Sequence, residues 1–233
     1  MAAPVCAVVG VGVGNGTAIA RRFARGGYGV ALLARGDAVT APLAKELPGA
    51  RQYACDAADP AALEPVFARV AAEMGEVETL IYNAGGGTWG SIEELDVQAF
   101  EAAWRINALG LFAAARLVIP AMKRKGAGNI VAISATAARR GMPRTAAFAP
   151  AKSAQRILAE SMARTLWPAG IHVAVVPIDG IVDLPRTRER MKDKPDEFFV
   201  KPDDVAETVW NLVRQPRSTW SFELEVRPYR ETW

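Results

Sequence analysis

The sequence predicts a single α/β domain built on a doubly wound parallel sheet of about seven strands, with helices on both faces. Short apolar runs alternate with longer helical patterns along the whole chain, which is typical of parallel strands joined by helical crossovers. The length of 233 residues suits one domain (1–233) and is too short for two ordinary ones. Half of the residues are apolar and 23% are charged, which is typical of a soluble globular chain.

The predicted strands are short, apolar and β-branched, as expected for strands that are buried on both faces. They are 5–9, 29–34, 51–55, 78–83, 129–134, 172–177 and 222–226. The helical patterns between them are 15–25, 38–46, 61–74, 96–124, 146–167 and 202–214. A charged, irregular stretch at about 180–201 follows the sixth strand. Ligands of open α/β sheets bind outside the carboxyl ends of the strands, so we expect this stretch to be a substrate lid.

Several classes of function are disfavoured by composition. The net charge is only +3, and no basic tract is interleaved with aromatic residues, so nucleic-acid binding is not expected. Two cysteines and one histidine, His172, offer neither a disulfide framework nor a metal site. The apolar run 108–122 is broken by Arg116 and is too short to span a bilayer, and the N-terminus lacks a basic signal-peptide region. These features predict a cytoplasmic protein without a membrane partner.

A glycine-rich turn follows the first strand. In VGVGVGNGTAIA, three glycines have the spacing G-x-x-x-G-x-G, and the turn opens directly into a helix. Glycine allows the backbone to turn sharply and to approach a pyrophosphate, whose charge then faces the helix N-terminus. The alternative is an ordinary strand-to-helix turn. The position of this motif, inside the first βαβ unit, favours a Rossmann-type dinucleotide site.

The end of the second strand bears on the choice of cofactor. A carboxylate there would bind the ribose 2′-hydroxyl of NAD, but this chain has the neutral Ala34 followed by Arg35. A guanidinium suits a 2′-phosphate, so NADP(H) is favoured over NAD(H). An ordinary surface arginine is the alternative.

The spacing of the glycines resembles that of the short-chain dehydrogenase/reductase family, and further motifs agree in the correct order. CDAAD (55–59) resembles the acidic motif after the third strand, and YNAG (82–85) resembles the family's N-N-A-G. NALG (107–110) resembles N-x-x-G, and ISATAARRG (133–141) resembles S-S-x-A-G-x-x-G. FAPAK (148–152) lies where the family has Y-x-x-x-K.

The resemblance implies hydride transfer to or from a nicotinamide, with a proton exchanged by a tyrosine that a lysine assists. A serine holds the substrate oxygen, and an asparagine holds a water molecule. It also implies a homodimer or homotetramer paired through the long helices. The cofactor-binding residues predicted from the turn, the strand ends and these motifs are Gly10, Gly14, Asn15, Gly16, Arg35, Asp56, Ala57, Asn83, Ala84, Gly85, Lys152 and Ile181.

This chain departs from the family pattern at the reacting centre. Of the four catalytic positions, only Asn107 and Lys152 keep the family's residue type. Phe148 stands at the tyrosine position and Ala135 at the serine position, thirteen residues earlier. One deletion in the loop would bring Thr136 into the serine slot instead.

Other residues are candidates for a proton donor or a substrate contact. Tyr82 and Asp179 lie after the fourth and sixth strands, although a supporting tyrosine and a turn-forming aspartate are the preferred interpretations. Trp89 either lines the substrate pocket or packs. The lid arginines, among them Arg188, either meet an anionic substrate or form a solvated face.

Two functions follow from this pattern. The first is an NADP(H)-dependent oxidoreductase that reduces a small carbonyl, enone or imine without a tyrosine proton donor. The second is a catalytically silent dinucleotide-binding protein that acts as a sensor or as an oligomer partner. The intact cofactor half of the site favours the first.

Overall fold

The computed structural model describes residues 3–231 and contains a parallel sheet of six strands in the order β3-β2-β1-β4-β5-β6. The chain reverses its direction of winding between β1 and β4, so the sheet is doubly wound as predicted. The strands are β1 (Val5–Val9), β2 (Gly29–Ala34), β3 (Arg51–Ala54), β4 (Val77–Tyr82), β5 (Gly128–Ala135) and β6 (Ile171–Ile178).

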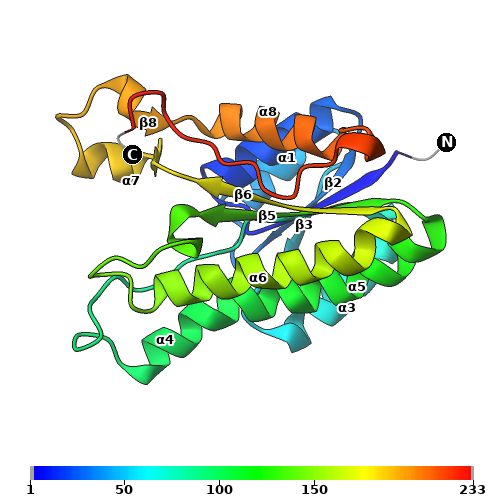
Figure 1. Cartoon of the computed structure of the whole chain (residues 1–233). Coiled ribbons are helices and arrows are strands. Elements are labelled where there is room, and N and C mark those ends of the chain that lie inside the picture. The colour runs from blue at the N-terminus through cyan, green and yellow to red at the C-terminus, as the bar shows by residue number, and fades with distance from the viewer. Residues whose placement is uncertain (1–2, 232–233) are drawn as a thin grey trace.

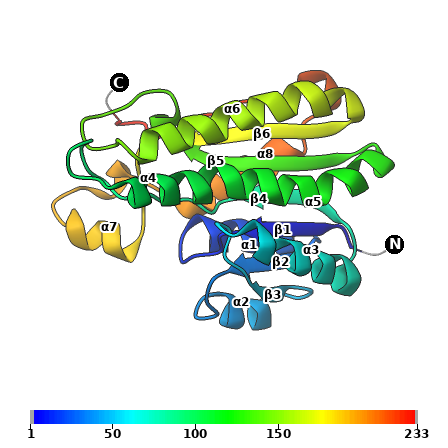
Figure 2. The ribbon, with the colours of Figure 1, turned by 90° about the horizontal axis from the view of Figure 1, so that it is seen from below.

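Helices cover both faces of the sheet (Figures 1 and 2). On one face, α1 and α8 pack against alternate strand residues such as Val8 and Ile133, and on the other, α3, α5 and α6 pack against residues such as Val9 and Ala132. The sheet is therefore buried on both sides, which explains its continuous apolar strands. The helices are α1 (Asn15–Arg25), α2 (Thr40–Glu46), α3 (Pro60–Met74), α4 (Val97–Trp104), α5 (Gly110–Lys125), α6 (Phe148–Leu166), α7 (Pro185–Arg190) and α8 (Pro202–Val213).

The seventh predicted strand, 222–226, is extended and lies beside β6 but is not a continuous strand. It forms two isolated parallel bridges with β6, from Glu223 to Val175 and from Val226 to Ile178. Leu224 N donates to Val175 O, and Val226 N donates to Pro177 O, each at 3.0 Å. The N–H needed between these two bonds would belong to Pro177, which has none. The prediction of about seven strands is thus corrected to six, because a proline interrupts the last ladder.

The stretch predicted as an irregular lid is more ordered than expected. It contains the helix α7 and a two-stranded parallel pair, β7 (Ile181–Val182) with β8 (Phe199–Val200). Figure 1 shows this segment in orange at the carboxyl end of the sheet. Short-range ion pairs account for the order: Arg188 donates to both oxygens of Asp183, at 2.6 and 2.7 Å, and Lys201 donates to Asp183 at 2.7 Å.

The helix predicted over 96–124 is interrupted. A π turn at Arg105–Leu109 separates α4 from α5, so the two helices run on from one another with one widened turn. The combined stretch Val97–Lys125 is long and apolar enough to cross a membrane by composition. In the fold, α5 packs against α3 and the sheet through residues such as Leu111 and Val118, as a core helix does.

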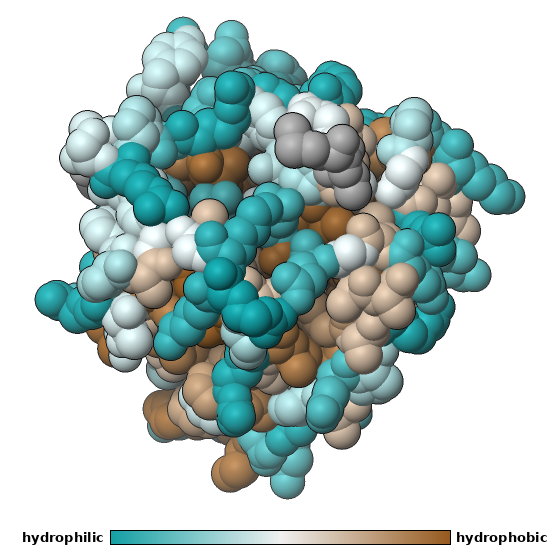
Figure 3. All heavy atoms as spheres, turned by 90° about the vertical axis from the view of Figure 1, so that its right-hand side faces the viewer, coloured by the Kyte–Doolittle hydropathy of each residue, from teal (hydrophilic) through white to brown (hydrophobic). Residues whose placement is uncertain are grey.

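The opposite end of the sheet, where the strands begin, carries a shallow hollow. It is lined by residues from β1, the end of α3, the start of β4 and the end of α5, among them Val5, Met74 and Lys125. Figure 3 views this end and shows hydrophilic side chains interspersed with hydrophobic ones. The predicted site residues lie at the other end.

Candidate functional site

The glycine turn packs directly against the end of β4. Gly10 has φ +90°, and a Cβ at this position would lie 2.4 Å from the backbone nitrogen of Ala84. A Cβ on Gly16 would lie 2.7 Å from Gly10 O. The side chain of Asn83 donates from Nδ2 to Gly10 O at 2.7 Å. The predicted residues of the turn and of the N-A-G motif therefore form one unit, and only glycine fits at Gly10 and Gly16.

The N-terminus of α1 is arranged to receive an anion. Gly14 is its N-cap, no side chain caps the helix, and its first turn contains no acidic residue. The positive end of the helix dipole is thus not capped by a side chain, although Thr17 N donates to Gly12 O at 3.2 Å. The side-chain oxygen of Asn15 is buried and has no hydrogen-bond partner within residues 3–231. A turn in which only glycine fits, leading into an uncapped helix, suits the diphosphate of a dinucleotide.

The lid touches the same turn. A Cβ on Gly14 would lie 2.4 Å from Leu184 Cδ2, so the residue preceding α7 rests on the phosphate turn. Ile181, predicted from the family pattern, lies nearby in sequence and forms β7. The segment predicted as a lid thus contacts the glycine turn through Leu184.

The residues predicted to bind the adenosine half lie at the ends of β2 and β3. Arg35 follows β2 and is exposed. Asp56 follows β3, and its carboxylate accepts from Ala58 N at 2.9 Å. Ala57 is buried, and its carbonyl oxygen is close to Gly110, the first residue of α5. An exposed guanidinium at this edge is free to meet a 2′-phosphate.

Lys152 and Asn107 meet beside Gly85. A Cβ on Gly85 would lie 2.9 Å from Asn107 Oδ1 and 3.0 Å from Lys152 Nζ, so both polar atoms border the loop after β4. Asn107 lies in the π turn, and its Nδ2 donates to Gly86 O at 2.6 Å and to Ala103 O at 2.8 Å. Its Oδ1 is buried and has no partner within residues 3–231. Widened turns of this kind are frequent at functional sites.

Burial controls the charge of Lys152. Its Nζ donates to Ile133 O and to Gln155 Oε1, each at 3.1 Å. Neither acceptor is ionised, and burial lowers the pKa of Lys152 from its usual 10.5 to about 7. Burial therefore destabilises the ammonium form of Lys152. Ribose hydroxyl groups that accept hydrogen bonds from Nζ would stabilise it.

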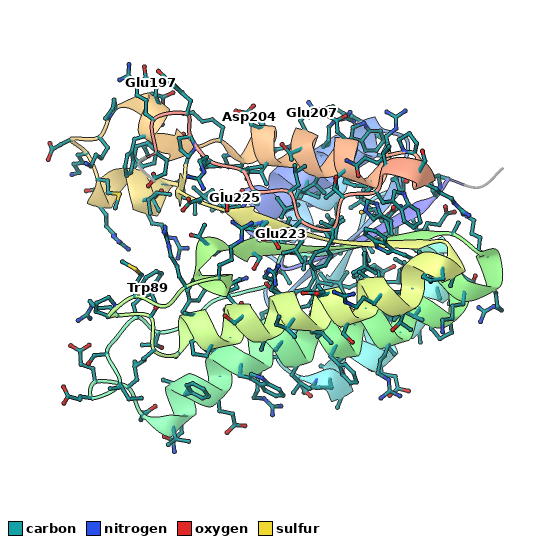
Figure 4. All side chains as sticks on the ribbon, in the orientation of Figure 1. Trp89, Glu197, Asp204, Glu207, Glu223 and Glu225 are labelled. Atoms are coloured by element: carbon teal, nitrogen blue, oxygen red, sulfur yellow. The ribbon has the colours of Figure 1, made fainter. Side chains whose placement is uncertain are left out.

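An aromatic pair occupies the place of the predicted acid. Phe148 is the first residue of α6, and its ring stacks on that of Trp89 with ring centroids 5.3 Å apart. Trp89 is 60% exposed, and Figure 4 shows it at the end of the molecule where the lid lies. Lys152 Nζ is 5.9 Å from the Phe148 ring centroid, so the i, i+4 geometry of the motif is kept while the hydroxyl is absent.

Ala135 occupies the predicted serine slot at the end of β5 and has no hydroxyl, and the hydroxyl of its neighbour Ser134 is buried with no hydrogen-bond partner within residues 3–231. Ser134 is buried, whereas Ala135 is partly exposed. The hydroxyl of Thr136, the alternative occupant of the slot, donates to Asp179 Oδ1 at 3.1 Å. The other oxygen of Asp179 pairs with Arg227 at 2.9 Å. Asp179, considered as an acid, thus has both carboxylate oxygens engaged.

The other candidates have structural contacts. The hydroxyl of Tyr82 is buried and donates to Ile106 O, inside the π turn, at 2.6 Å. Arg188 is held in the lid by Asp183 and stacks 4.0 Å from the Phe199 ring. His172 stacks on Trp220 with centroids 4.7 Å apart, at the amino end of β6.

Two features of the site were missed by the sequence analysis. One is Gln155, which contacts both Lys152 and the π turn; a polar residue on the inward face of α6 was its only signal. The other is a group of ion pairs that holds the C-terminal segment against β6. In this group Arg139 and Arg156 both bind Glu223, which Figure 4 labels beside Glu225.

Comparison with known proteins agrees with this geometry. Mouse 3-ketodihydrosphingosine reductase is 33% identical over 156 residues, or 63% of this chain. The matched part spans 46% of the mouse enzyme, so the chain covers about half of that relative's length. D-threitol dehydrogenase of Mycolicibacterium smegmatis is 29% identical over 87% of this chain and 82% of its own length.

A solved structure extends the likeness to the whole fold. A metagenomic short-chain oxidoreductase, crystallised in complex with NADP, superimposes with a TM-score of 0.85 at 26% identity, covering 99% of each chain. The sequence model of the short chain dehydrogenases matches residues 4–195. With its glycine turn, its order of strands and its paired Asn107 and Lys152, the chain belongs to the short-chain dehydrogenase family.

Proposed function

We propose that this protein is an NADP(H)-dependent oxidoreductase that transfers hydride to a small carbonyl, enone or imine substrate without a tyrosine proton donor. The observation that carries the proposal is the contrast within one site. The glycine turn, Asn107 and Lys152 are assembled around the cofactor position, while Phe148 and Ala135 supply no hydroxyl. Arg35 supports NADP(H) over NAD(H), as does the NADP bound by the similar metagenomic enzyme.

Different residues would bind different parts of the cofactor. The α1 N-terminus and Gly14 would hold the diphosphate, Arg35 the 2′-phosphate, and Lys152 the nicotinamide ribose. When bound, the nicotinamide supplies the hydride. Asn107 Oδ1 offers an acceptor for a water molecule next to Lys152.

The missing acid limits the range of substrates. General acid–base catalysis contributes about 10²–10⁴-fold, or roughly 3–5 kcal/mol of barrier. Reduction of a neutral ketone produces an alkoxide that needs a proton, whereas reduction of an iminium produces a neutral amine that needs none. The stacked rings of Trp89 and Phe148 present a flat apolar wall, which supports a planar, conjugated substrate.

The alternative is a dinucleotide-binding protein without turnover. It is supported by the paired loss at Phe148 and Ala135 and by the way Trp89 packs on the Phe148 ring. Such a protein would act as a sensor or as a partner in an oligomer.

We also propose a homodimer or homotetramer in the cytoplasm. Val97, Phe100 and Trp104 follow one another at helical spacing on α4 and are 75%, 45% and 43% exposed. An exposed apolar stripe of this kind supports a contact between subunits.

A binding and turnover series tests the function. NADPH binding is measured by fluorescence, and ketones, enones and imines are then screened through the absorbance of the reduced nicotinamide. We expect NADPH to bind and to be oxidised faster by imines and enones than by ketones of the same shape. Binding without oxidation across the panel would establish the silent alternative, and absence of binding would exclude both functions.

The double variant Phe148→Tyr with Ala135→Ser serves as the internal check. Restoring both hydroxyls should raise ketone reduction by about 10²-fold or more and lower the preference for imines over ketones. No gain on ketones would mean that residues 135 and 148 do not face the substrate.

A further inference from the structure

Gln155 links the two site residues that the chain retains. It lies on α6 three residues after Lys152 and is fully buried. Its Oε1 accepts from Lys152 Nζ at 3.1 Å, and its Nε2 donates to the main-chain oxygen of Asn107 at 3.2 Å. The oxygen of the Gln155 amide thus binds Lys152 on α6, and its nitrogen binds Asn107 in the π turn. Both partners are residues of the candidate site.

The contact with Asn107 falls on an irregular point of the backbone. Asn107 lies inside the π turn between α4 and α5, where carbonyl groups are displaced from the regular α-helical ladder. Gln155 donates to this buried carbonyl oxygen from a different helix, which adds a tertiary hydrogen bond at the π turn. The side chain of Asn107, whose Oδ1 borders Gly85, therefore projects from a backbone that Gln155 holds in place.

The contact with Lys152 fixes the other end. Within residues 3–231, the Lys152 ammonium donates to the Ile133 carbonyl and the Gln155 amide and lies 5.9 Å from the centroid of the Phe148 ring, and none of these groups is charged. Gln155 is the one side-chain acceptor among them. With phenylalanine at residue 148, the side chain four residues before Lys152 offers it no hydroxyl.

We propose that Gln155 is a positioning residue, which holds the Lys152 ammonium and the Asn107 backbone at a fixed spacing so that both meet the ribose end of the cofactor together. This inference rests on the proposed use of Lys152 to bind a nicotinamide ribose. Its primary readout is taken on the protein without cofactor, so it can fail while the proposed function stands.

The test measures the titration of Lys152 directly. The chain has seven lysines, and ¹³C labelling at their ε carbons gives few resonances to follow by NMR. The resonance of Lys152 is the one that disappears in Lys152→Met. In the native protein its midpoint reports the pKa of Lys152, which burial lowers to about 7.

Two variants of similar size should move this midpoint in opposite directions. Gln155→Leu removes an acceptor of the charged form, so the midpoint should fall by about one pH unit. Gln155→Glu adds a negative charge beside Nζ, so the midpoint should rise by about one unit or more. Gln155→Leu should also weaken NADPH binding about tenfold, measured by fluorescence at pH 7.

Gln215→Leu is the matched control. Gln215 also uses both ends of its amide, because Nε2 donates to Ser221 Oγ at 3.0 Å and Oε1 accepts from Ser221 N at 2.8 Å. It holds the C-terminal segment, away from Lys152, so its loss should lower stability without moving the Lys152 midpoint.

The outcomes separate positioning from plain packing. Opposite shifts in the two Gln155 variants, with no shift in Gln215→Leu, support the proposal. A midpoint that stays fixed in Gln155→Glu overturns it, and so do shifts in the same direction. If Gln155→Leu does not fold, Gln155→Glu decides alone, because it keeps the shape of the side chain and one oxygen.

Discussion

Lys152 carries the strongest chemical constraint at the scale of single residues. Its ammonium is buried with two neutral acceptors, so the protein destabilises the charged form. Buried ionisable groups with a shifted pKa are frequent at functional sites. The position of Nζ beside Gly85 and Asn107 Oδ1 agrees with the proposed role of Lys152 in binding the cofactor. The cost of burial should be visible in stability measurements.

We expect the contribution of Lys152 to stability to depend on pH. Burial lowers its pKa from 10.5 to about 7, so between these values the unfolded chain binds more protons than the folded one. The free energy of unfolding therefore rises with pH, by at most about 1.4 kcal/mol per pH unit. Relative to Lys152→Met, the native protein should gain about 2 kcal/mol between pH 7 and pH 9, measured by urea denaturation.

The same substitution at the exposed Lys45 is the control for this measurement. A difference between native protein and Lys152→Met that stays constant from pH 7 to pH 9 would show that the ammonium is solvated.

The positions of single residues were predictable where the spacing of a motif within one helix determines which side chains share a face. The i, i+4 spacing placed Phe148 and Lys152 on one face of α6, and the structure shows the ammonium 5.9 Å from the ring centroid. Gln155 was not predictable, because its role depends on a contact with Asn107, 48 residues away. Nothing in the local sequence identifies that partner.

At the scale of elements, the glycine turn couples the first strand to the fourth. Gly10 adopts a left-handed φ and leaves no room for a Cβ against Ala84, while Asn83 bonds to its carbonyl oxygen. The phosphate turn and the loop bordering Lys152 are therefore held by the same contacts. A change in one of them should be transmitted to the other.

A pair of glycine substitutions tests this coupling. Gly10→Ala should lower the free energy of unfolding by about 2 kcal/mol or more, because φ is +90° and the added Cβ would lie 2.4 Å from a backbone atom. Gly12→Ala is the matched control in the same turn, since no atom lies within 4 Å of its added Cβ. Its stability should change by less than about 0.5 kcal/mol in chemical denaturation. Equal effects at the two positions would contradict the packing described.

Elements were predicted well where hydrophobic periodicity is unbroken. The first two strands and the first helix have the bounds expected from the sequence. The π turn at Arg105–Leu109 was missed, because the apolar pattern of 96–124 continues through it and the widened turn depends on tertiary hydrogen bonds. The seventh strand was overestimated, because its interruption comes from Pro177 on the neighbouring strand.

At the scale of the whole molecule, the exposed face of α4 and α5 is the feature that the single chain leaves unexplained. Phe100 and Trp104 lie on α4, and Phe112 on the following helix α5 is likewise 43% exposed. The proposed homodimer or homotetramer would bury these rings.

Charged residues in this face should separate the subunits. We expect the native protein to sediment as a multiple of the 24.9 kDa chain, and the double variant Phe100→Glu with Trp104→Glu to sediment near 24.9 kDa. Ile92→Glu changes an apolar residue outside α4 that is even more exposed, at 79%, and should leave the mass unchanged. A native protein that sediments as a monomer would refute the proposal. A double variant that stays oligomeric would place the contact elsewhere.

The global arrangement followed from the sequence more completely than the site did. Alternating strand and helix patterns, together with the right-handed crossover rule, imply a doubly wound sheet, and the structure confirms it. The segment at about 180–201 is not irregular as predicted, because ion pairs among Asp183, Arg188 and Lys201 order it, and its role as a lid stays a prediction. Charged side chains in a loop do not reveal their partners to sequence reasoning.

The C-terminal segment beside β6 also covers the edge strand of the sheet. A bare outer strand exposes a row of amide and carbonyl groups to which another chain can add as an extra strand. Here residues 222–226 occupy that row, and Arg139 and Arg156 fasten Glu223 over it. Salt or a mutation that breaks these ion pairs would expose the edge of β6 and favour aggregation. The cofactor end of the molecule would not be changed by it.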